Sequence, residues 1–140
     1  MLRAGGRFLS TEHGPHVGDE INVLTRGDHG GWPQTAGNGI FNYTPTIAPA
    51  GGGVYSADLI PQWIGSVLFV TLKDSSLRRL VFARDGSVAD EEILYRGVFG
   101  RLRDVAVGPD GAVYLATSNR DGRGVRREGD DRILRIAPTR

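Results

Sequence analysis

The segment Gly65-Ser-Val-Leu-Phe-Val-Thr71 has the pattern of a buried β-strand: a short run of β-branched, aliphatic and aromatic residues that follows a glycine. The same arrangement, a Gly six residues before a Thr, occurs in Gly5-Gly-Arg-Phe-Leu-Ser-Thr11 and in Gly111-Ala-Val-Tyr-Leu-Ala-Thr117. Each copy is followed by a second apolar stretch, at residues 21–24, 77–81 and 132–136. The sequence therefore contains a repeated pair of strands.

The spacing of this repeat indicates a β-propeller. The three Thr residues lie 60 and 46 positions apart, which suits blades of about 40–50 residues that carry insertions. Helical periodicity is nearly absent, and turn signals such as Asp85-Gly86 separate the apolar runs. We predict an all-β chain of about three blades, with an unrelated β-sandwich as the alternative. The expected strands are Arg7–Thr11, Glu20–Leu24, Gly53–Ser56, Ser66–Leu72, Leu77–Phe82, Glu92–Tyr95, Arg103–Val107, Ala112–Thr117 and Arg132–Ile136.

About three blades cannot close a ring, because closed propellers have about four to eight. The open arc would leave unpaired strand edges, which proteins normally cover. We therefore expect residues 1–140 to be one part of a larger propeller domain. The alternative is a chain that covers its open edges by associating with partners or with a second copy of itself.

Composition excludes several classes of function. The 140 residues are 39% hydrophobic and 24% charged, as in folded soluble domains. No run of about 18 apolar residues predicts a membrane span, and the first residues lack the apolar stretch of a secretory signal. A net charge of +1 argues against nucleic-acid binding. Without cysteine there are no disulfides, zinc-thiolate sites or thiol nucleophiles, and no nucleophile elbow, phosphate loop or dinucleotide fingerprint is present.

The densest polar cluster is Glu12-His13-Gly14-Pro15-His16, followed closely by Gly18-Asp19-Glu20. A turn at Gly14-Pro15 can direct carbonyl oxygens at a hard cation such as calcium. This is more plausible than a zinc site on the two histidines, which lack a third ligand at a suitable spacing. The plainer alternative is a polar turn in which Asp19 and Glu20 cap neighbouring backbone groups.

Three basic residues are candidates for binding an anion. Lys73 is the only lysine beside 16 arginines and follows an apolar strand, so its compact ammonium is a candidate for a specific contact. Arg101 and Arg103 lie two residues apart, and residues at that spacing on a strand point to the same face. Paired guanidiniums suit carboxylates or phosphates. The alternative is a solvated strand edge with Asp104 or a nearby Glu as counterion. The polar stretch at residues 119–131 is expected to be a solvated loop, although its Asp and Asn residues could bind a cation if they cluster.

Together these pieces resemble the soluble aldose sugar dehydrogenases that depend on pyrroloquinoline quinone (PQQ), the glucose/sorbosone dehydrogenase family. The resemblance rests on motifs that follow in family order: Thr11-Glu-His-Gly-Pro15, Gly18-Asp-Glu-Ile-Asn22, Gly30-Gly-Trp-Pro33, Pro45-Thr-Ile-Ala-Pro49, Leu72-Lys73, Arg101-Leu-Arg-Asp104, Gly108-Pro-Asp-Gly111, Thr117-Ser-Asn-Arg-Asp-Gly-Arg-Gly124 and Asp130-Asp-Arg-Ile-Leu134. It implies a six-bladed β-propeller, of which this chain covers the C-terminal part.

The resemblance also implies a set of site residues. The main-chain carbonyls of Gly14 and Pro15 would bind the calcium ion that touches the quinone. Five side chains would contact or hold PQQ: His13, Thr46, Lys73, Arg101 and Arg103. Glu20 matches a carboxylate that serves a second calcium in some members, although Gly30 stands where those members have a tyrosine.

The implied reaction is oxidation of the C1 hydroxyl of an aldose to the lactone, with hydride transfer to PQQ. In the family, the histidine base and an Arg-Asn cofactor contact lie upstream of the segment that this sequence matches. None of His13, His16 and His29 therefore matches the base. We therefore expect the isolated chain to be inactive. Because family members are generally exported, the resemblance also implies a periplasmic or secreted location. The rival hypothesis is a non-catalytic propeller segment that binds protein or carbohydrate, because a fold does not determine a function.

Overall fold

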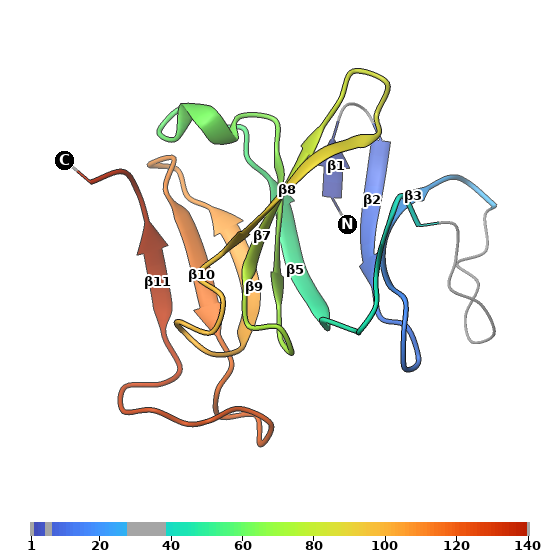
Figure 1. Ribbon diagram of the computed structural model, residues 1–140. Helices are drawn as coiled ribbons and strands as arrows, with labels where there is room; N and C mark the ends of the chain where they lie inside the picture. Colours follow the sequence, from blue (N-terminus) through green and yellow to red (C-terminus); the bar gives the residue numbers. More distant parts are fainter. Residues whose placement is uncertain (1, 5–6, 28–38, 140) are drawn as a thin grey trace.

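The computed structural model describes residues 2–4, 7–27 and 39–139, which form three antiparallel sheets (Figure 1). The first sheet contains β1 (Leu2–Ala4), β2 (Arg7–Glu12), β3 (Asp19–Leu24) and β4 (Phe41–Tyr43). The second contains β5 (Pro49–Val54), β6 (Val67–Thr71), β7 (Leu77–Phe82) and β8 (Val88–Leu94). The third contains β9 (Leu102–Val107), β10 (Val113–Thr117) and β11 (Ile133–Ile136). Among the described residues the only helical element is the short 3₁₀ turn η1 (Pro61–Trp63).

Each sheet is a simple up-and-down meander, in which strands that follow one another in the chain are hydrogen-bonded neighbours. The three repeated segments become β2, β6 and β10, the second strand of every sheet, and the apolar stretches that follow them become β3, β7 and β11. The predicted repeat and the all-β class are confirmed.

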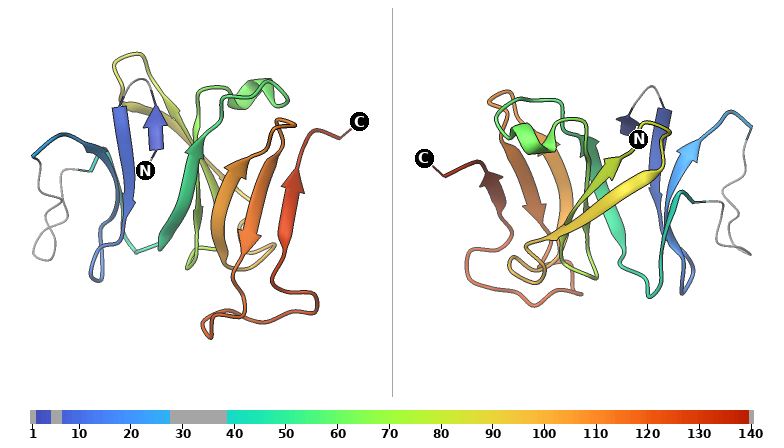
Figure 2. Two further views of the ribbon diagram at one scale, coloured as in Figure 1. Left: turned by 180° about the vertical axis from the view of Figure 1, so that it is seen from behind. Right: turned by 45° about the horizontal axis from the view of Figure 1, so that its top comes forward.

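The sequence of β6 is a continuous apolar run because the strand is packed between two other sheets. Figures 1 and 2 show the second sheet between the other two. Successive side chains of a strand point to opposite faces. Val67 and Phe69 accordingly join the core shared with the first sheet, while Leu68 and Val70 join the core shared with the third. All four are fully buried, as expected of a strand covered on both faces.

The first strands of the sheets approach one another closely, and this explains the glycine run in β5. β5 lies against both β1 and β9. A Cβ atom added at Gly51 would overlap the carboxylate of Asp104 on the neighbouring strand. Glycine is needed here for close contact between the sheets. The strand expected at Gly53–Ser56 is therefore wrong in position, because β5 begins at Pro49 and ends at Val54.

Other differences from prediction lie at sheet edges. The prediction did not include β1 and β4, which are three residues each. β8 begins at Val88 rather than Glu92, because this edge strand carries charged residues that pair with Arg78 and Arg79 of β7. The remaining expected strands agree with the structure to within one residue at each end.

Alternating strand direction sorts the loops into two groups. The β2–β3, β4–β5, β6–β7, β8–β9 and β10–β11 loops all lie at the lower edge of Figure 1, which we call the site end. The β5–β6, β7–β8 and β9–β10 connections lie at the opposite end. Within the described residues, no helix has the length and apolar character needed to cross a membrane.

Candidate functional site

The loops of the site end carry nearly all the residues proposed from the sequence. His13, Gly14 and Pro15 are in the β2–β3 turn, Thr46 is in the β4–β5 loop and Lys73 is in the β6–β7 loop. Arg101 directly precedes β9, and Arg103 is the second residue of that strand. Residues up to 90 positions apart in sequence are thus gathered at one end by the meander alone.

Asp19 fixes the β2–β3 turn against the β4–β5 loop. This carboxylate is 1% exposed. Its Oδ1 accepts a hydrogen bond from the N–H of Gly14 at 2.9 Å, and its Oδ2 accepts from the N–H groups of Ile47 at 2.6 Å and Ala48 at 2.7 Å. The predicted capping role of Asp19 is confirmed, although its reach across to the next loop could not be foreseen from sequence.

The turn held by Asp19 presents free carbonyl oxygens. A Cβ atom at Gly14 would overlap the backbone oxygen of Val17, so only glycine allows the chain to fold back this tightly. Within the described residues, neither the Gly14 nor the Pro15 carbonyl accepts a hydrogen bond. Pro15 is exposed and Gly14 half-buried. Neither oxygen is therefore engaged by a hydrogen bond from the described residues.

His13 is tied to the second sheet rather than pointing freely outward. Its Nε2 lies 2.7 Å from the carbonyl oxygen of Pro49, at the start of β5. A ring nitrogen that faces a carbonyl oxygen carries the proton and donates it there. Nε2 of His13 is therefore a donor in this arrangement and does not act as a proton acceptor.

Lys73 meets Thr46, a second residue proposed from the resemblance. The exposed Lys73 ammonium donates to Oγ1 of Thr46 at 2.7 Å. The backbones of the same two loops are also joined, because the N–H of Lys73 donates to the Ile47 carbonyl at 3.0 Å and that of Leu72 to the Ala48 carbonyl at 2.8 Å. A cavity of about 420 Å³ opens beside them, lined in part by Thr46 and Lys73.

A buried ion network lies directly beneath the Lys73 loop. Arg78 donates to Asp74 at 2.6 Å and to Glu91 at 2.7 Å, and Arg96 also pairs with Asp74. Burial alone would raise the pKa of Asp74, but its hydrogen bonds from Arg78 and Ser76 and the nearby guanidiniums lower it below the ordinary value. The loop that carries Lys73 is therefore anchored by charges that stay ionised.

Arg101 and Arg103 point together, as their spacing predicts, and both bind Asp121 of the β10–β11 loop. The Asp121 Oδ2 accepts from Arg101 at 2.8 Å and 3.1 Å and from Arg103 at 3.2 Å. The Arg101 hydrogen bond is the main reason that the pKa of Asp121 falls to about 2. The expectation that Asp104 or a nearby Glu is the counterion is wrong, because Asp104 instead lies against Gly51.

Two further contacts connect Arg101 to its surroundings. Its guanidinium also donates to the Leu72 carbonyl, next to Lys73, at 3.3 Å. Asn119 accepts from the N–H of Arg101 and donates to the Phe99 carbonyl, both at 2.9 Å. The β10–β11 loop is therefore fastened to the β8–β9 loop. The described residues contain no group of three or more His, Cys, Asp or Glu side chains arranged for a metal ion.

Glu20 stands apart from the other predicted residues. It is 3% exposed, on the second residue of β3. Its Oε2 accepts from Asn22 at 3.1 Å, whereas its buried Oε1 has no hydrogen-bond partner. The predicted capping of backbone groups by Glu20 is therefore not seen. His29, Gly30 and the rest of the motif that ends at Pro33 lie outside the described residues.

Comparison with known proteins places this arrangement in a family. The family profile named glucose / sorbosone dehydrogenase matches residues 1–39 and 36–127. The aldose sugar dehydrogenase YliI of Escherichia coli K12 is 32% identical over 133 residues, which are 79% of this chain and 35% of that protein. An uncharacterized Synechocystis protein, slr1608, is 32% identical over 142 residues, 87% of this chain and 34% of its own. The chain thus spans about a third of the length of these curated relatives.

Solved structures agree in fold. A glucose dehydrogenase-type oxidoreductase of Thermus thermophilus superposes with a TM-score of 0.81 at 36% identity, over 96% of this chain and 42% of that one. The PQQ-bound aldose sugar dehydrogenase of Streptomyces coelicolor superposes with a TM-score of 0.79 at 31% identity, over 97% and 41%. The chain therefore belongs to the glucose/sorbosone dehydrogenase family, and its three sheets are part of that family's β-propeller.

Proposed function

We propose that this chain forms the cofactor-binding part of a PQQ- and calcium-dependent aldose sugar dehydrogenase, which oxidises the C1 hydroxyl of an aldose to the lactone. The main support is the convergence of Lys73, Arg101 and Arg103 at the site end, with Asp121 as the carboxylate between the two arginines. An ammonium on the β6–β7 loop and two guanidiniums at the start of β9 form a receptor for a ligand that carries several carboxylates.

The donor set fits PQQ, which has several carboxylates and an ortho-quinone. In this proposal Thr46, Lys73, Arg101 and Arg103 would hold the cofactor, and the exposed His13 would contact it. The free carbonyls of Gly14 and Pro15 are oxygen ligands of the kind that calcium prefers. When bound, PQQ would supply a hydride acceptor and calcium would supply a Lewis acid.

The chain's own residues position the cofactor. Asp19 sets the Gly14–Pro15 turn relative to the β4–β5 loop, and backbone hydrogen bonds set that loop relative to Lys73. The Arg101 bond to the Leu72 carbonyl continues this connection to the third sheet. The calcium ligands and the three cationic groups are thereby held at fixed separations, which is the preorganisation that binding needs.

We assign no proton acceptor for the sugar hydroxyl to the described residues. Nε2 of His13 donates to the Pro49 carbonyl, so this nitrogen is not free to take a proton, and neither His13 nor His16 matches the position of the family's base. In this proposal the base is contributed by the remainder of the propeller, since the chain spans only about a third of its relatives. The isolated chain then binds the cofactor without oxidising sugar.

Calorimetric titration of the purified chain with PQQ, first with calcium and then with a chelator, tests the proposal. We expect saturable binding that requires calcium and weakens at least roughly tenfold in Lys73→Ala and in Arg103→Ala, since each removes a charge-assisted contact. Arg126→Ala, at an exposed arginine of the β10–β11 loop, is the matched control. Absence of binding by a folded chain, or equal binding by all variants, would favour a non-catalytic binding module instead.

A further inference from the structure

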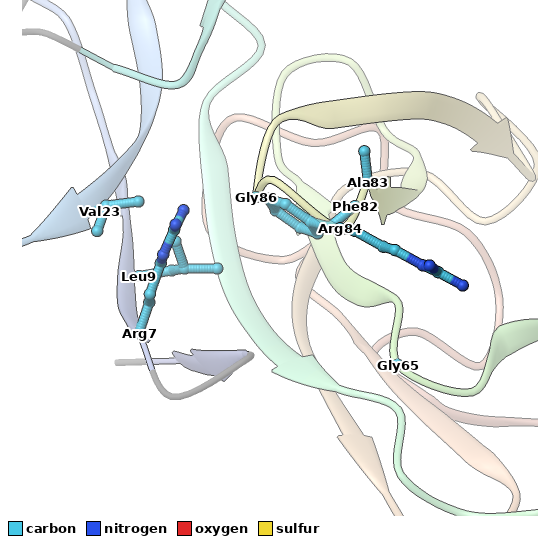
Figure 3. A pocket seen from close by; sticks show the side chains of 8 residues that line it. All are labelled: Arg7, Leu9, Val23, Gly65, Phe82, Ala83, Arg84 and Gly86. Carbon is cyan, nitrogen blue, oxygen red and sulfur yellow. The ribbon is translucent and has the colours of Figure 1, made fainter.

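A second cavity lies at the end of the sheets opposite to the candidate site. It has a volume of about 350 Å³ and opens between the first and second sheets. Figure 3 shows side chains of β2 and β3 on one side and those of the β7–β8 hairpin on the other. Its size is at the lower limit of cavities that hold small molecules, about 300–1,000 Å³.

The interior of this cavity is apolar. Leu9 of β2, Val23 of β3 and Phe82 at the end of β7 line it. Leu9 is 2% exposed, and the other two are half-buried and pack against the core between the first two sheets. The cavity is thus a continuation of that core which opens to solvent.

Two glycines keep the opening free of side chains. Gly65 has a φ of 79°, and a Cβ atom there would meet nothing within 4 Å. Gly86, with a φ of 84°, lies directly under the Arg7 guanidinium, which a Cβ atom would displace. Positive φ is the conformation that glycine adopts readily, so the local backbone and the opening depend on the same residues.

The charge at the opening is positive, and neither of its two arginines forms an ion pair with a described residue. Arg7 and Arg84 line the cavity, and no acidic residue does. Arg7 makes one long hydrogen bond of 3.4 Å, to the Asp85 backbone carbonyl. Arg84 has no hydrogen bond or ion pair within the part of the chain that the structure describes. By contrast, seven other arginines are each paired with a carboxylate: Arg78, Arg79, Arg96, Arg101, Arg103, Arg132 and Arg135.

The nearest carboxylate is already used within the β7–β8 turn. Asp85 Oδ1 accepts from the hydroxyl of Ser87 at 2.7 Å and from its N–H at 2.9 Å. These bonds are the main reason that the pKa of Asp85 is lowered, and the charge of Arg7 adds only a small further effect. Asp85 therefore stabilises the turn and makes no ion pair with either arginine.

We propose that this cavity binds a small monocarboxylate with an apolar body, either aromatic or short aliphatic. The apolar part packs against Leu9, Val23 and Phe82, while the carboxylate receives hydrogen bonds from Arg7, whose planar donor group suits it. The Arg84 side chain points away from Arg7 (Figure 3), so it adds positive charge at the opening and not a second direct contact. The site is separate from the proposed cofactor site and does not rest on the proposed function. It makes the protein responsive to a second ligand bound between two blades.

Titration of the ¹⁵N-labelled chain with 3-phenylpropionate and with hexanoate, followed by NMR, tests this inference. We expect saturable shifts of the Gly65 and Gly86 amides with at least one of the acids, and the comparison tells the aromatic from the aliphatic ligand. The neutral 3-phenylpropan-1-ol should bind at least roughly tenfold more weakly, because it lacks the charge-assisted bonds.

Variants then test the two arginines. Arg7→Gln should weaken acid binding roughly tenfold or more and Arg84→Gln should weaken it less, while Arg126→Gln should leave it unchanged. Circular dichroism checks that each variant is folded. The titration of the wild-type chain tests the proposal even where a variant does not fold. Equal binding of the acid and the alcohol, unchanged affinity in Arg7→Gln, or no saturable shift at Gly65 and Gly86 would each overturn the proposal.

Discussion

Replacing Asp19 with Ala should destabilise the protein more than any single change in an exposed loop. The substitution removes the acceptor of three backbone N–H groups, those of Gly14, Ile47 and Ala48, at distances of 2.6 to 2.9 Å. A hydrogen bond to a charged group contributes about 1.5–3 kcal/mol. Gly14 and Ala48 are only half-buried and can recover water, whereas Ile47 is buried. We therefore expect a loss of about 3–5 kcal/mol in the free energy of unfolding.

The isosteric change Asp19→Asn separates the contribution of the individual oxygens. An amide has one carbonyl oxygen, which can stay at the Oδ2 position and keep the bonds from Ile47 and Ala48. The NH₂ group then faces the N–H of Gly14, and that bond is lost. The expected loss is about 1.5–3 kcal/mol, smaller than that for Asp19→Ala.

Guanidinium chloride unfolding followed by far-UV circular dichroism measures both losses. Asp58→Ala, at an exposed aspartate in the loop between β5 and β6, is the control and should change the free energy by no more than about 0.5 kcal/mol. The argument would be refuted if Asp19→Ala were within about 1 kcal/mol of wild type, since one charge-assisted bond alone exceeds that. It would also be refuted if the Asn and Ala variants were equally unstable, because the oxygens would then not act separately.

Three further predictions concern charged groups. Arg78→Met leaves the carboxylates of Asp74 and Glu91 without their shared cation and should lower the free energy of unfolding by about 3–5 kcal/mol in denaturant titrations; a loss below about 1 kcal/mol would contradict the importance of this network. Glu20 Oε1 is buried without a hydrogen-bond partner. If this oxygen is a cation ligand, calcium should raise the melting temperature of the wild type more than that of Glu20→Gln. Identical calcium responses of the two proteins would exclude Glu20 as a ligand. Because the pKa of Asp121 falls from 3.8 to about 2 on folding, its stabilisation is present above the unfolded value and is lost as the pH falls toward 2. Asp121→Asn should therefore reduce the acid sensitivity of unfolding in this interval, and an unchanged acid titration would show that the Arg101 contact does not persist in solution.

The fold was largely predictable because its repeat is visible as a pattern of neighbouring residues in the sequence. β2, β6 and β10 each carry a compact apolar pattern bounded by turn residues, and such patterns depend on nearest neighbours along the chain. β5 was misplaced for the opposite reason. Its Gly51-Gly-Gly53 run has no strand propensity, and it is extended because Asp104 of the neighbouring sheet leaves no room for a side chain. That cause lies in tertiary contact and has no local signal.

The features of the candidate site were likewise predictable only where local sequence determines them. The shared direction of Arg101 and Arg103 followed from a two-residue spacing on a strand. Their counterion did not, because Asp121 lies in an irregular loop whose path depends on bonds such as that of Asn119 to the Phe99 carbonyl. The pairing of Lys73 with Thr46 joins residues 27 positions apart in different loops. Only the family resemblance grouped them in advance.

Asp121 also determines how an anion can enter the site. Two guanidiniums that share one face repel each other unless a negative charge lies between them, and in this structure Asp121 supplies that charge. An anion that binds both arginines must therefore either share them with Asp121 or displace it. Asp121 belongs to the long β10–β11 loop, whereas Arg101 and Arg103 are held by β9 and its flanking residue. Displacement would thus move the loop and leave the sheet in place, so the β10–β11 loop, and not the strands, is the element that adjusts to an anionic ligand.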